Sequence, residues 1–224
     1  MKKLSLLFTK DGLQWHISKG KTVLEEAFHF VTEETSPHLG EEKLDDVLKF
    51  DDYKEIEVIS ALNHFSLTPD TFAEHELGYK LISYNAPVDE ANEELMLSVN
   101  KKFAVQFYYT FPKHFYQKIK AKKLPTKFNF SGEKFLNALT VKNHKEIHIN
   151  LYHHQVEFFA FENKKVVLYN NLDADSEVDF LYFIMFSLSK INFGTAETHF
   201  HIYGETHENE TFISELRKFV KNIK

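Results

Sequence analysis

The sequence predicts an α+β (α/β) protein of two related lobes, each a β-β-β-α-β-α unit with a mixed sheet. The first observation is an internal repeat, because residues 4–24 and 147–167 carry one pattern, 143 positions apart without a gap. In both copies apolar and polar residues alternate, which indicates half-buried strands. The second observation is the abundance of aromatic residues, 23 Phe and 10 Tyr, which favours a strand-rich core.

The repeat aligns three successive runs. In copy one Asp11-Gly12 separates the first two runs, and this dipeptide favours a hairpin because Gly tolerates positive φ. A basic turn then leads into the third run. The matched positions are Leu4, Leu6 and Phe8 with Ile147, Ile149 and Leu151; Leu13, Trp15 and Ile17 with Val156, Phe158 and Ala160; and Lys21, Val23 and Leu24 with Lys164, Val166 and Val167.

The first lobe is assigned to residues 1–145, with inserted middle elements. Residues 65–70 predict a turn and the start of a helix, since Pro69 suits a first helical turn. The other predicted elements are strands at 4–9, 13–18, 22–31 and 55–62 with a helix at 41–50, then a strand at 103–109, a helix at 112–123, a strand at 127–130 and a short helix at 132–139.

The second lobe is assigned to residues 146–224 and repeats the order of the first. Asp175-Ser176 precedes an apolar run that predicts a helix up to Lys190. The remaining predicted elements are strands at 146–151, 155–162, 164–171 and 199–203 and a final amphipathic helix at 210–221.

Composition limits the class of protein. The chain has no cysteine, which excludes a disulfide framework, a thiol nucleophile and a cysteine-based metal site. We expect a cytoplasmic protein without a signal peptide or an integral membrane segment, since no apolar run reaches the length of a span. Residues 1–112 carry a net charge of −9 and residues 113–224 one of +3. The acidic half argues against a protein that binds nucleic acid over its whole surface.

The predicted topology resembles the ribonuclease-H-like fold as it occurs twice in the actin-like ATPase superfamily. It is similar in style to the actin-like proteins of pilus biogenesis, type II secretion and cell division. More specifically, the chain resembles a family of uncharacterised Bacteroidota proteins, a domain of unknown function. That resemblance is carried by Phe65-Ser66-Leu67-Thr68-Pro69, Lys165-Val166-Val167-Leu168-Tyr169-Asn170, Asp179-Phe180-Leu181-Tyr182-Phe183 and Ile202-Tyr203-Gly204-Glu205.

The superfamily resemblance implies an Asp-x-Gly turn after the first strand of each lobe, where Asp helps to hold a hydrated metal and Gly admits phosphate. In copy two Asn150 stands at the Asp position and Tyr152 at the Gly position. Asn lacks the charge that Mg²⁺ prefers, and Tyr fills space that a phosphate needs. Where the superfamily has Gly-Gly near the adenosine, this chain has Gly204-Glu205.

In copy one Leu7 stands at the Asp position, and Asp11 is interpreted as a turn former rather than a metal ligand. The sequence thus predicts a degenerate nucleotide cleft without a catalytic residue or cofactor, and retained nucleotide binding without hydrolysis stays an alternative. Its candidate residues are Asn150, Tyr152, His153, Gly204, Glu205, Asp11 and Gly12.

Two other groups of residues are candidate sites. His199 and His201 share a strand face that His148 can match, but no carboxylate is expected at ligand spacing, so we predict no metal site. The basic residues beside Phe115 and Tyr116 are typical of a solvated helix end, with RNA as the alternative ligand. This candidate basic patch consists of Lys118, Lys120, Lys122, Lys123 and Lys127.

The sequence therefore favours a non-catalytic actin-like scaffold that binds a protein partner. The alternative is a nucleotide- or nucleic-acid-binding protein that uses the cleft or the basic patch. The sequence does not identify the partner or the oligomeric state.

Overall fold

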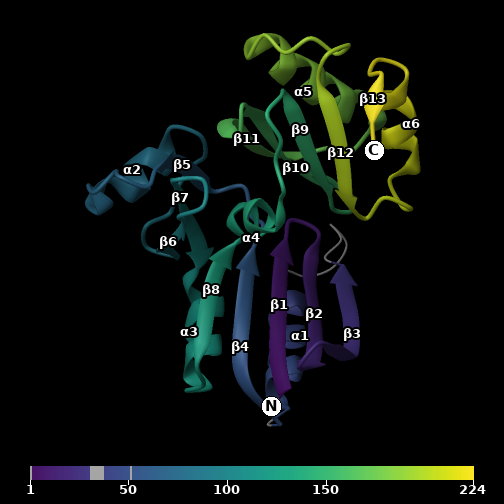
Figure 1. Ribbon diagram of the computed structural model, residues 1–224. Coiled ribbons are helices and arrows are strands. Elements are labelled where there is room, and N and C mark those ends of the chain that lie inside the picture. Colours follow the sequence, from purple (N-terminus) through teal and green to yellow (C-terminus); the bar gives the residue numbers. More distant parts are fainter. Residues whose placement is uncertain (1, 31–37, 51) are drawn as a thin grey trace. The chain divides into compact units, whose positions relative to one another are not determined.

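Two five-stranded mixed sheets form the framework (Figure 1). The computed structural model describes residues 2–30, 38–50 and 52–224. The chain divides into two units, Met1–Lys134 and Phe135–Lys224, and each sheet lies within one of them. Both sheets contain antiparallel and parallel pairs, which confirms the predicted α+β class with mixed sheets.

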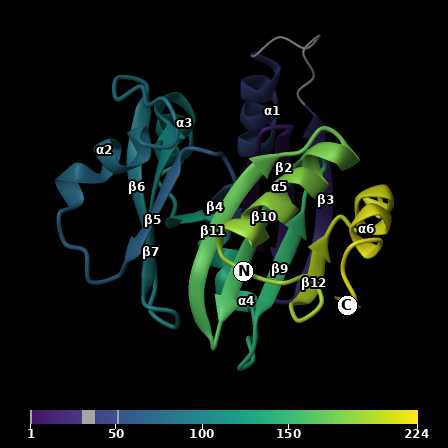
Figure 2. The same cartoon turned by 90° about the horizontal axis from the view of Figure 1, so that it is seen from above.

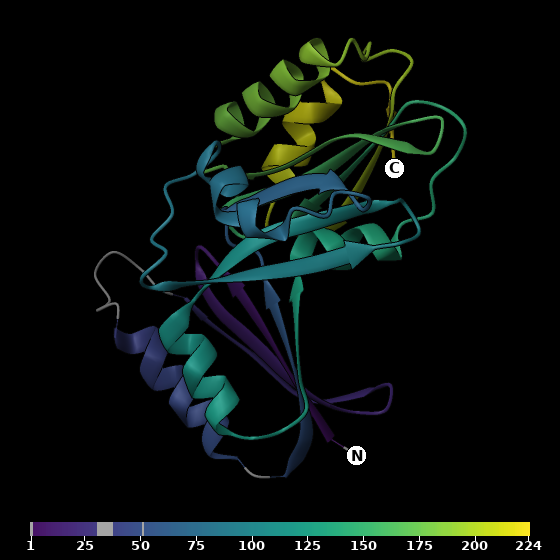
Figure 3. The same ribbon diagram turned by 90° about the vertical axis from the view of Figure 1, so that its left-hand side faces the viewer.

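The first sheet has the order β3-β2-β1-β4-β8. Its first three strands form an antiparallel meander, and β4 and β8 run parallel to β1. Two helices, α1 and α3, cover one face (Figure 3), where Leu4, Leu6, Leu44 and Ile119 are fully buried. The bounds are β1 (Lys2–Thr9), β2 (Gly12–Lys19), β3 (Thr22–Phe30), α1 (His38–Lys49), β4 (Tyr53–Ser60), α3 (Lys113–Ala121) and β8 (Thr126–Phe130). Val31, the last residue of the predicted third strand, lies outside the described residues.

A three-stranded antiparallel sheet is inserted between β4 and α3, with the order β5-β7-β6. Figure 2 shows these strands with the short helix α2 beside them. The added Cβ of an alanine at Gly78 would lie 2.7 Å from the Leu95 side chain, so the helix packs closely on this sheet. The bounds are β5 (Phe65–Pro69), η1 (His75–Leu77), α2 (Gly78–Ser83), β6 (Glu93–Asn100) and β7 (Val105–Pro112).

Two predictions fail in this insertion. Residues 65–70 do not start a helix, because Phe65–Pro69 pairs with β7 and Pro69 sits at the strand end, where its missing N–H costs little. The sequence also missed β6, whose alternation is inverted. Its inward-facing Ser98 and Asn100 are buried. Ser98 Oγ accepts a hydrogen bond from Phe130 N at 3.0 Å, and Asn100 Nδ2 donates one to Glu133 Oε1 at 3.2 Å. Polar partners therefore replace the apolar face that strand prediction relies on.

The second sheet has the order β11-β10-β9-β12-β13, with the same parallel and antiparallel pairs as the first sheet. Helices α5 and α6 cover the face that carries Ile147, Ile149 and Phe200. Ser176 caps α5, because its Oγ accepts a hydrogen bond from Asp179 N at 3.2 Å. The bounds are β9 (Glu146–Leu151), β10 (Gln155–Glu162), β11 (Lys165–Asp173), α5 (Glu177–Lys190), β12 (His199–Gly204), α6 (Glu210–Arg217) and β13 (Asn222–Ile223).

The final helix is shorter than predicted. It ends at Arg217 instead of Lys221. The last turn tightens there, because Lys218 N and Phe219 N donate three residues back, to Glu215 O and Leu216 O. The chain then adds β13 parallel to β12, and Lys224 N donates to Phe200 O at 2.9 Å.

The 143-residue offset of the sequence repeat also relates the observed strands. Both ends of β2 and β3 map onto both ends of β10 and β11 at this offset. The irregularity between Ile17 and Ser18 in the first sheet maps onto the one between Ala160 and Phe161 in the second. Because a bulge is a specific local feature of a strand pair, its repetition supports a duplicated unit.

The boundary between the units falls inside helix α4 (Ser131–Ala138), eleven residues before the position assigned from the sequence. The physical reason is the packing of Phe135, whose ring lies 5.9 Å from that of Phe159 and 5.4 Å from that of Tyr203. Residues 135–145 therefore belong with the second sheet, although they precede its first strand.

A buried carboxyl group, Glu57 of β4, gathers charged side chains of the first unit. Its Oε1 lies 2.7 Å from Lys134 Nζ and its Oε2 lies 2.6 Å from Lys3 Nζ. Asn129 Nδ2 adds a third hydrogen bond at 3.1 Å. Burial opposes ionisation of this group, but the two lysines outweigh burial and hold the pKa of Glu57 below its usual value of 4.5.

Because the folded state has the lower pKa, the contribution of Glu57 is present above pH 4.5 and is lost as the pH falls through the folded pKa. We expect Glu57→Gln to destabilise the first unit by about 1–3 kcal/mol at neutral pH. The same substitution should also reduce the decrease of the unfolding free energy between about pH 5 and pH 3, which urea unfolding at several pH values measures. Glu55→Gln on the same strand should keep the wild-type slope. Equal slopes for Glu57→Gln and wild type would contradict this account.

Candidate functional site

The second-lobe candidates surround a fully buried acidic side chain, Glu157 of β10. Asn150 lies directly opposite in the register, and its Nδ2 donates to Glu157 Oε1 at 2.8 Å. The Tyr152 hydroxyl donates to the same oxygen at 2.6 Å, and the Tyr169 hydroxyl donates to Oε2 at 2.9 Å. Three donors thus satisfy a group whose burial without partners would be strongly unfavourable. The sequence analysis missed Glu157, because it lies on the strand after the turn.

This arrangement differs from a turn that binds phosphate. Such a turn needs free backbone N–H groups that point at the anion. Here Tyr152 N donates to Gln155 O at 2.9 Å, so this N–H group is already hydrogen-bonded within the turn. The Tyr152 side chain reaches Glu157 and holds the turn against the sheet.

Gly204 and Glu205 lie beside this turn, at the end of β12. Gly204 pairs with Leu151 and has a φ of +82°. A Cβ added there would lie 2.2 Å from Leu151 O and 2.6 Å from Asn150 Oδ1. Glu205 N donates to Leu151 O at 2.9 Å. The structure therefore brings Asn150, Tyr152, Gly204 and Glu205 together, and the glycine permits close backbone contact.

A buried residue that the sequence analysis missed, Asn209, joins the two segments. Its Nδ2 donates to Tyr152 O at 2.9 Å and to Glu205 O at 2.8 Å. An Asn directly before a predicted helix is a typical N-cap, and this pattern was the available signal. His153 lies at the rim of the turn, with Nδ1 3.4 Å from Glu208 Oε2.

The first-lobe candidates, Asp11 and Gly12, lie in the hairpin between β1 and β2. Asp11 N donates to Thr9 Oγ1 at 3.2 Å, and Thr9 Oγ1 donates to Gly12 O at 3.4 Å. Gly12 has a φ of +143°, in a region that favours glycine. The backbone at Asp11 and Gly12 therefore forms the hairpin turn, and the role of the Asp11 side chain stays a prediction.

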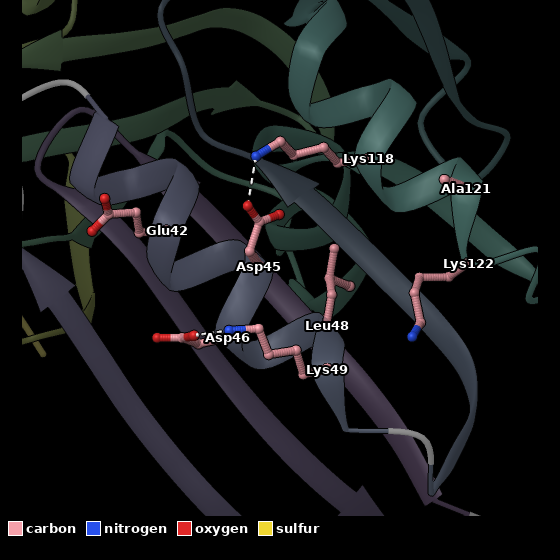
Figure 4. A pocket seen from close by; sticks show the side chains of 8 residues that line it. All are labelled: Glu42, Asp45, Asp46, Leu48, Lys49, Lys118, Ala121 and Lys122. Atoms are coloured by element: carbon pink, nitrogen blue, oxygen red, sulfur yellow. Dashed lines mark hydrogen bonds and ion pairs between the residues drawn. The ribbon is translucent and has the colours of Figure 1, made fainter.

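The candidate basic patch lies along α3 and the segment that follows it. Lys118 faces α1, and its Nζ lies 2.8 Å from Asp45 Oδ2 and 3.5 Å from Glu41 Oε2. The hydrogen bond to Asp45 raises the pKa of Lys118 above its ordinary value. A shallow groove of about 730 Å³ lies between these helices and is also lined by Asp46, Lys49 and Lys122. Figure 4 shows the side chains that line it. The groove therefore carries charges of both signs.

The other members of the patch do not share one helix face. Helix α3 ends at Ala121, so Lys122 is its C-cap and Lys123 has a positive φ of 54°. Lys120, Lys123 and Lys127 are exposed, and Lys127 lies on β8.

The histidines of the second sheet gather around a carboxyl group that the sequence analysis did not expect there. Parallel pairing places His201 directly opposite His148, as the alternation predicted. Glu146, two residues before His148, lies on the same face. Its Oε2 lies 3.4 Å from His148 Nε2, and its Oε1 lies 3.5 Å from His201 Nε2. The expectation that no carboxylate stands at ligand spacing beside these histidines was wrong.

Burial dominates the electrostatics of this cluster. Burial is the largest cause that lowers the pKa of His148 to about 4. His201 acts in the same direction, and Glu146 acts in the opposite direction. Burial also lowers the pKa of His201. For Glu146 burial acts in the opposite direction, but hydrogen bonds from Lys142 N and His148 prevail and lower its pKa. Burial thus favours the neutral form of both imidazole rings.

Comparison with known proteins identifies the family. A model of the family described as "Protein of unknown function (DUF3822)" matches residues 1–223. The chain belongs to this family. A search of the curated proteins found no match. Among the described residues, no helix has the length and apolarity needed to cross a membrane.

Similar solved structures show the fold of this chain. A Bacteroides thetaiotaomicron protein, described as having an actin-like ATPase fold and unknown function, matches with a TM-score of 0.83 at 21% identity, over 99% of this chain and 89% of that chain. A chain from the PilM-PilN type IV pilus biogenesis complex matches with a TM-score of 0.61 at 10% identity, over 99% of this chain and 87% of that chain. The cytoplasmic domain of EpsL, from the type II secretion system of Vibrio cholerae, matches with a TM-score of 0.56 at 8% identity, over 100% and 85%. The predicted actin-like fold is confirmed.

The close approach at Gly204 predicts an unequal cost for two glycine substitutions. Gly204→Ala should destabilise the second unit by about 3 kcal/mol, because it combines a strained φ with a clash against backbone. Gly20→Ala is the matched control, since Gly20 has a φ of +62° in open space, and should cost about 1 kcal/mol. Urea unfolding measures both. Equal costs would contradict the close packing of β12 on the turn.

Proposed function

We propose that this protein is a non-catalytic actin-like module that binds a protein partner and does not hydrolyse nucleotide. The observation that carries the proposal is the hydrogen-bond network of Glu157. Asn150 and Tyr152, which stand where the superfamily resemblance implies Asp and Gly, both donate to this buried acidic side chain. The positions that would serve magnesium and phosphate thus stabilise the second sheet instead.

An exposed apolar stripe on α5 supports the partner-binding part. Val178, Tyr182 and Phe186 follow each other at four-residue spacing and therefore share one helix face. Their exposed fractions are 75%, 60% and 46%. The rings of Tyr182 and Phe186 stack with centroids 5.7 Å apart. Exposed aromatic side chains in a contiguous stripe are typical of protein interaction surfaces.

Charge beside the stripe indicates what kind of partner would fit. A shallow groove of about 510 Å³ between α5 and α6 is lined by Val178 and by three acidic residues, Glu177, Glu210 and Glu215. The acidic residues flank the Val178 end of the stripe, whereas Lys190 Nζ lies over the Phe186 ring at the other end, 4.9 Å from its centroid. The Val178 end therefore complements a segment that combines apolar and basic side chains. The structural neighbour PilM-PilN is itself a complex of two proteins, which supports a binding role by analogy of fold alone.

The alternative, binding of nucleic acid through the basic patch, has less support. Lys118 is engaged by Asp45 and Glu41, so acidic side chains offset the charge that would attract phosphates. The remaining lysines belong to a helix end, a loop and a strand instead of one continuous face.

Calorimetric titration with ATP and Mg²⁺ tests the nucleotide part. We expect no saturable binding at micromolar nucleotide and no release of phosphate, because the turn offers neither the acidic metal ligand nor the space. Micromolar binding with turnover would overturn the proposal, and binding without turnover would favour the alternative of a retained nucleotide site.

Selection of peptides from a random display library tests the binding surface without knowledge of the natural partner. Peptides that bind the wild-type chain should be enriched in basic and apolar residues. They should lose at least tenfold in affinity for the Tyr182→Ser/Phe186→Ser double variant. Tyr84→Ser is the matched control, because Tyr84 is 71% exposed but lies in the other unit. Equal binding to the double variant would exclude this stripe.

A further inference from the structure

The polar face of the second sheet carries a cluster whose geometry differs from that of an ordinary hydrogen-bonded pair. Glu146 and His148 come from β9, and His201 comes from the neighbouring parallel strand β12. Glu146 and His148 are each 1% exposed, and His201 is partly buried. Because all three residues stand on paired strands, the register fixes that their side chains share one face and lie next to one another.

The distances within the cluster fit a metal ion. The carboxyl oxygens of Glu146 lie 3.4 Å and 3.5 Å from the Nε2 atoms of His148 and His201. Both separations are long for hydrogen bonds, whose N–H···O distances usually lie at about 2.7–3.2 Å, so the bond between His148 and Glu146 is a weak one. A tetrahedral ion with bonds of about 2.0–2.1 Å places its ligands roughly 3.4 Å apart. One ligand atom from each residue lies within 4.8 Å of the others, so modest side-chain movement closes the polyhedron.

The surrounding groups orient the ligands as metal sites require. The Tyr203 hydroxyl lies 3.0 Å from His148 Nδ1, which leaves Nε2 available to an ion when Nδ1 carries the proton. Lys142 N donates to Glu146 Oε2 at 2.9 Å. His144 Nε2 lies 2.9 Å from Glu146 Oε1 and acts as a supporting residue. The side chains of His144 and His201 are 35% and 21% exposed, and they mark the side from which an ion would enter.

We propose that Glu146, His148 and His201 form a binding site for a divalent transition-metal ion of the Zn²⁺ class. Two imidazoles and one carboxylate suit Zn²⁺ better than Mg²⁺ or Ca²⁺, which prefer oxygen ligands alone. Three protein ligands leave a fourth position for water. This proposal is independent of the proposed function, because the cluster shares no residue with the Glu157 network or with the stripe on α5.

Competition between the full chain and a colorimetric Zn²⁺ chelator tests the site. The wild-type chain should bind one equivalent of Zn²⁺. His201→Ala should weaken binding at least tenfold. Tyr203→Phe leaves all three ligands in place and should still weaken binding about tenfold, because the orienting partner of His148 is lost. Circular dichroism should show that both variants are folded, since neither side chain is fully buried.

A matched control addresses adventitious binding by other histidines. His153 and His154 form a neighbouring pair with ring centroids 4.0 Å apart, and the His153→Ala/His154→Ala variant should bind Zn²⁺ as the wild type does. Substitution with Co²⁺ should give the intense visible absorption of a four-coordinate ion, lost in His201→Ala. Unchanged stoichiometry in His201→Ala, or loss of binding in the control variant, would overturn the proposal.

Discussion

The buried acidic side chain of Glu157 is the constraint on which the second lobe depends. A carboxyl group without solvent must be given hydrogen-bond donors by the protein. Those donors come from Asn150 on β9, Tyr152 in the turn and Tyr169 on β11. The same contacts therefore align three strands and close the turn in which an actin-like ATPase would hold phosphate. If the turn holds no nucleotide, as we propose, that property and the stability of the sheet have one physical cause.

The duplication shows which features of the architecture the two lobes share. Both sheets have one strand order, and a bulge recurs at the same offset of 143 residues. Folding requires alternation, bulge position and helix packing, and these are the features that the two copies share. The turns differ, since Asp11-Gly12 makes a hairpin in one copy and Tyr152 is fixed to Glu157 in the other. A lobe can keep its core while its turns diverge, because loops tolerate change better than packed strands.

Much of the fold could be predicted from the sequence, because alternation and helical periodicity report directly on burial. The bounds of β9 and β10 are those predicted. Periodicity did not predict β6, because the buried positions of this strand are polar. Ser98 and Asn100 form hydrogen bonds with residues of other elements. The residues that define the sites were missed for a related reason. Glu157 and Glu146 are acidic residues inside predicted strands, and only the pairing of strands reveals their partners.

The central claim is that Tyr152 and Glu157 close the turn by direct interaction. A double-mutant cycle of Tyr152→Phe and Glu157→Gln, followed by urea unfolding, measures this interaction most directly. The account predicts a coupling free energy of about 1 kcal/mol or more, since the two side chains share one hydrogen bond at 2.6 Å. Substitutions whose costs add to within about 0.3 kcal/mol would contradict it.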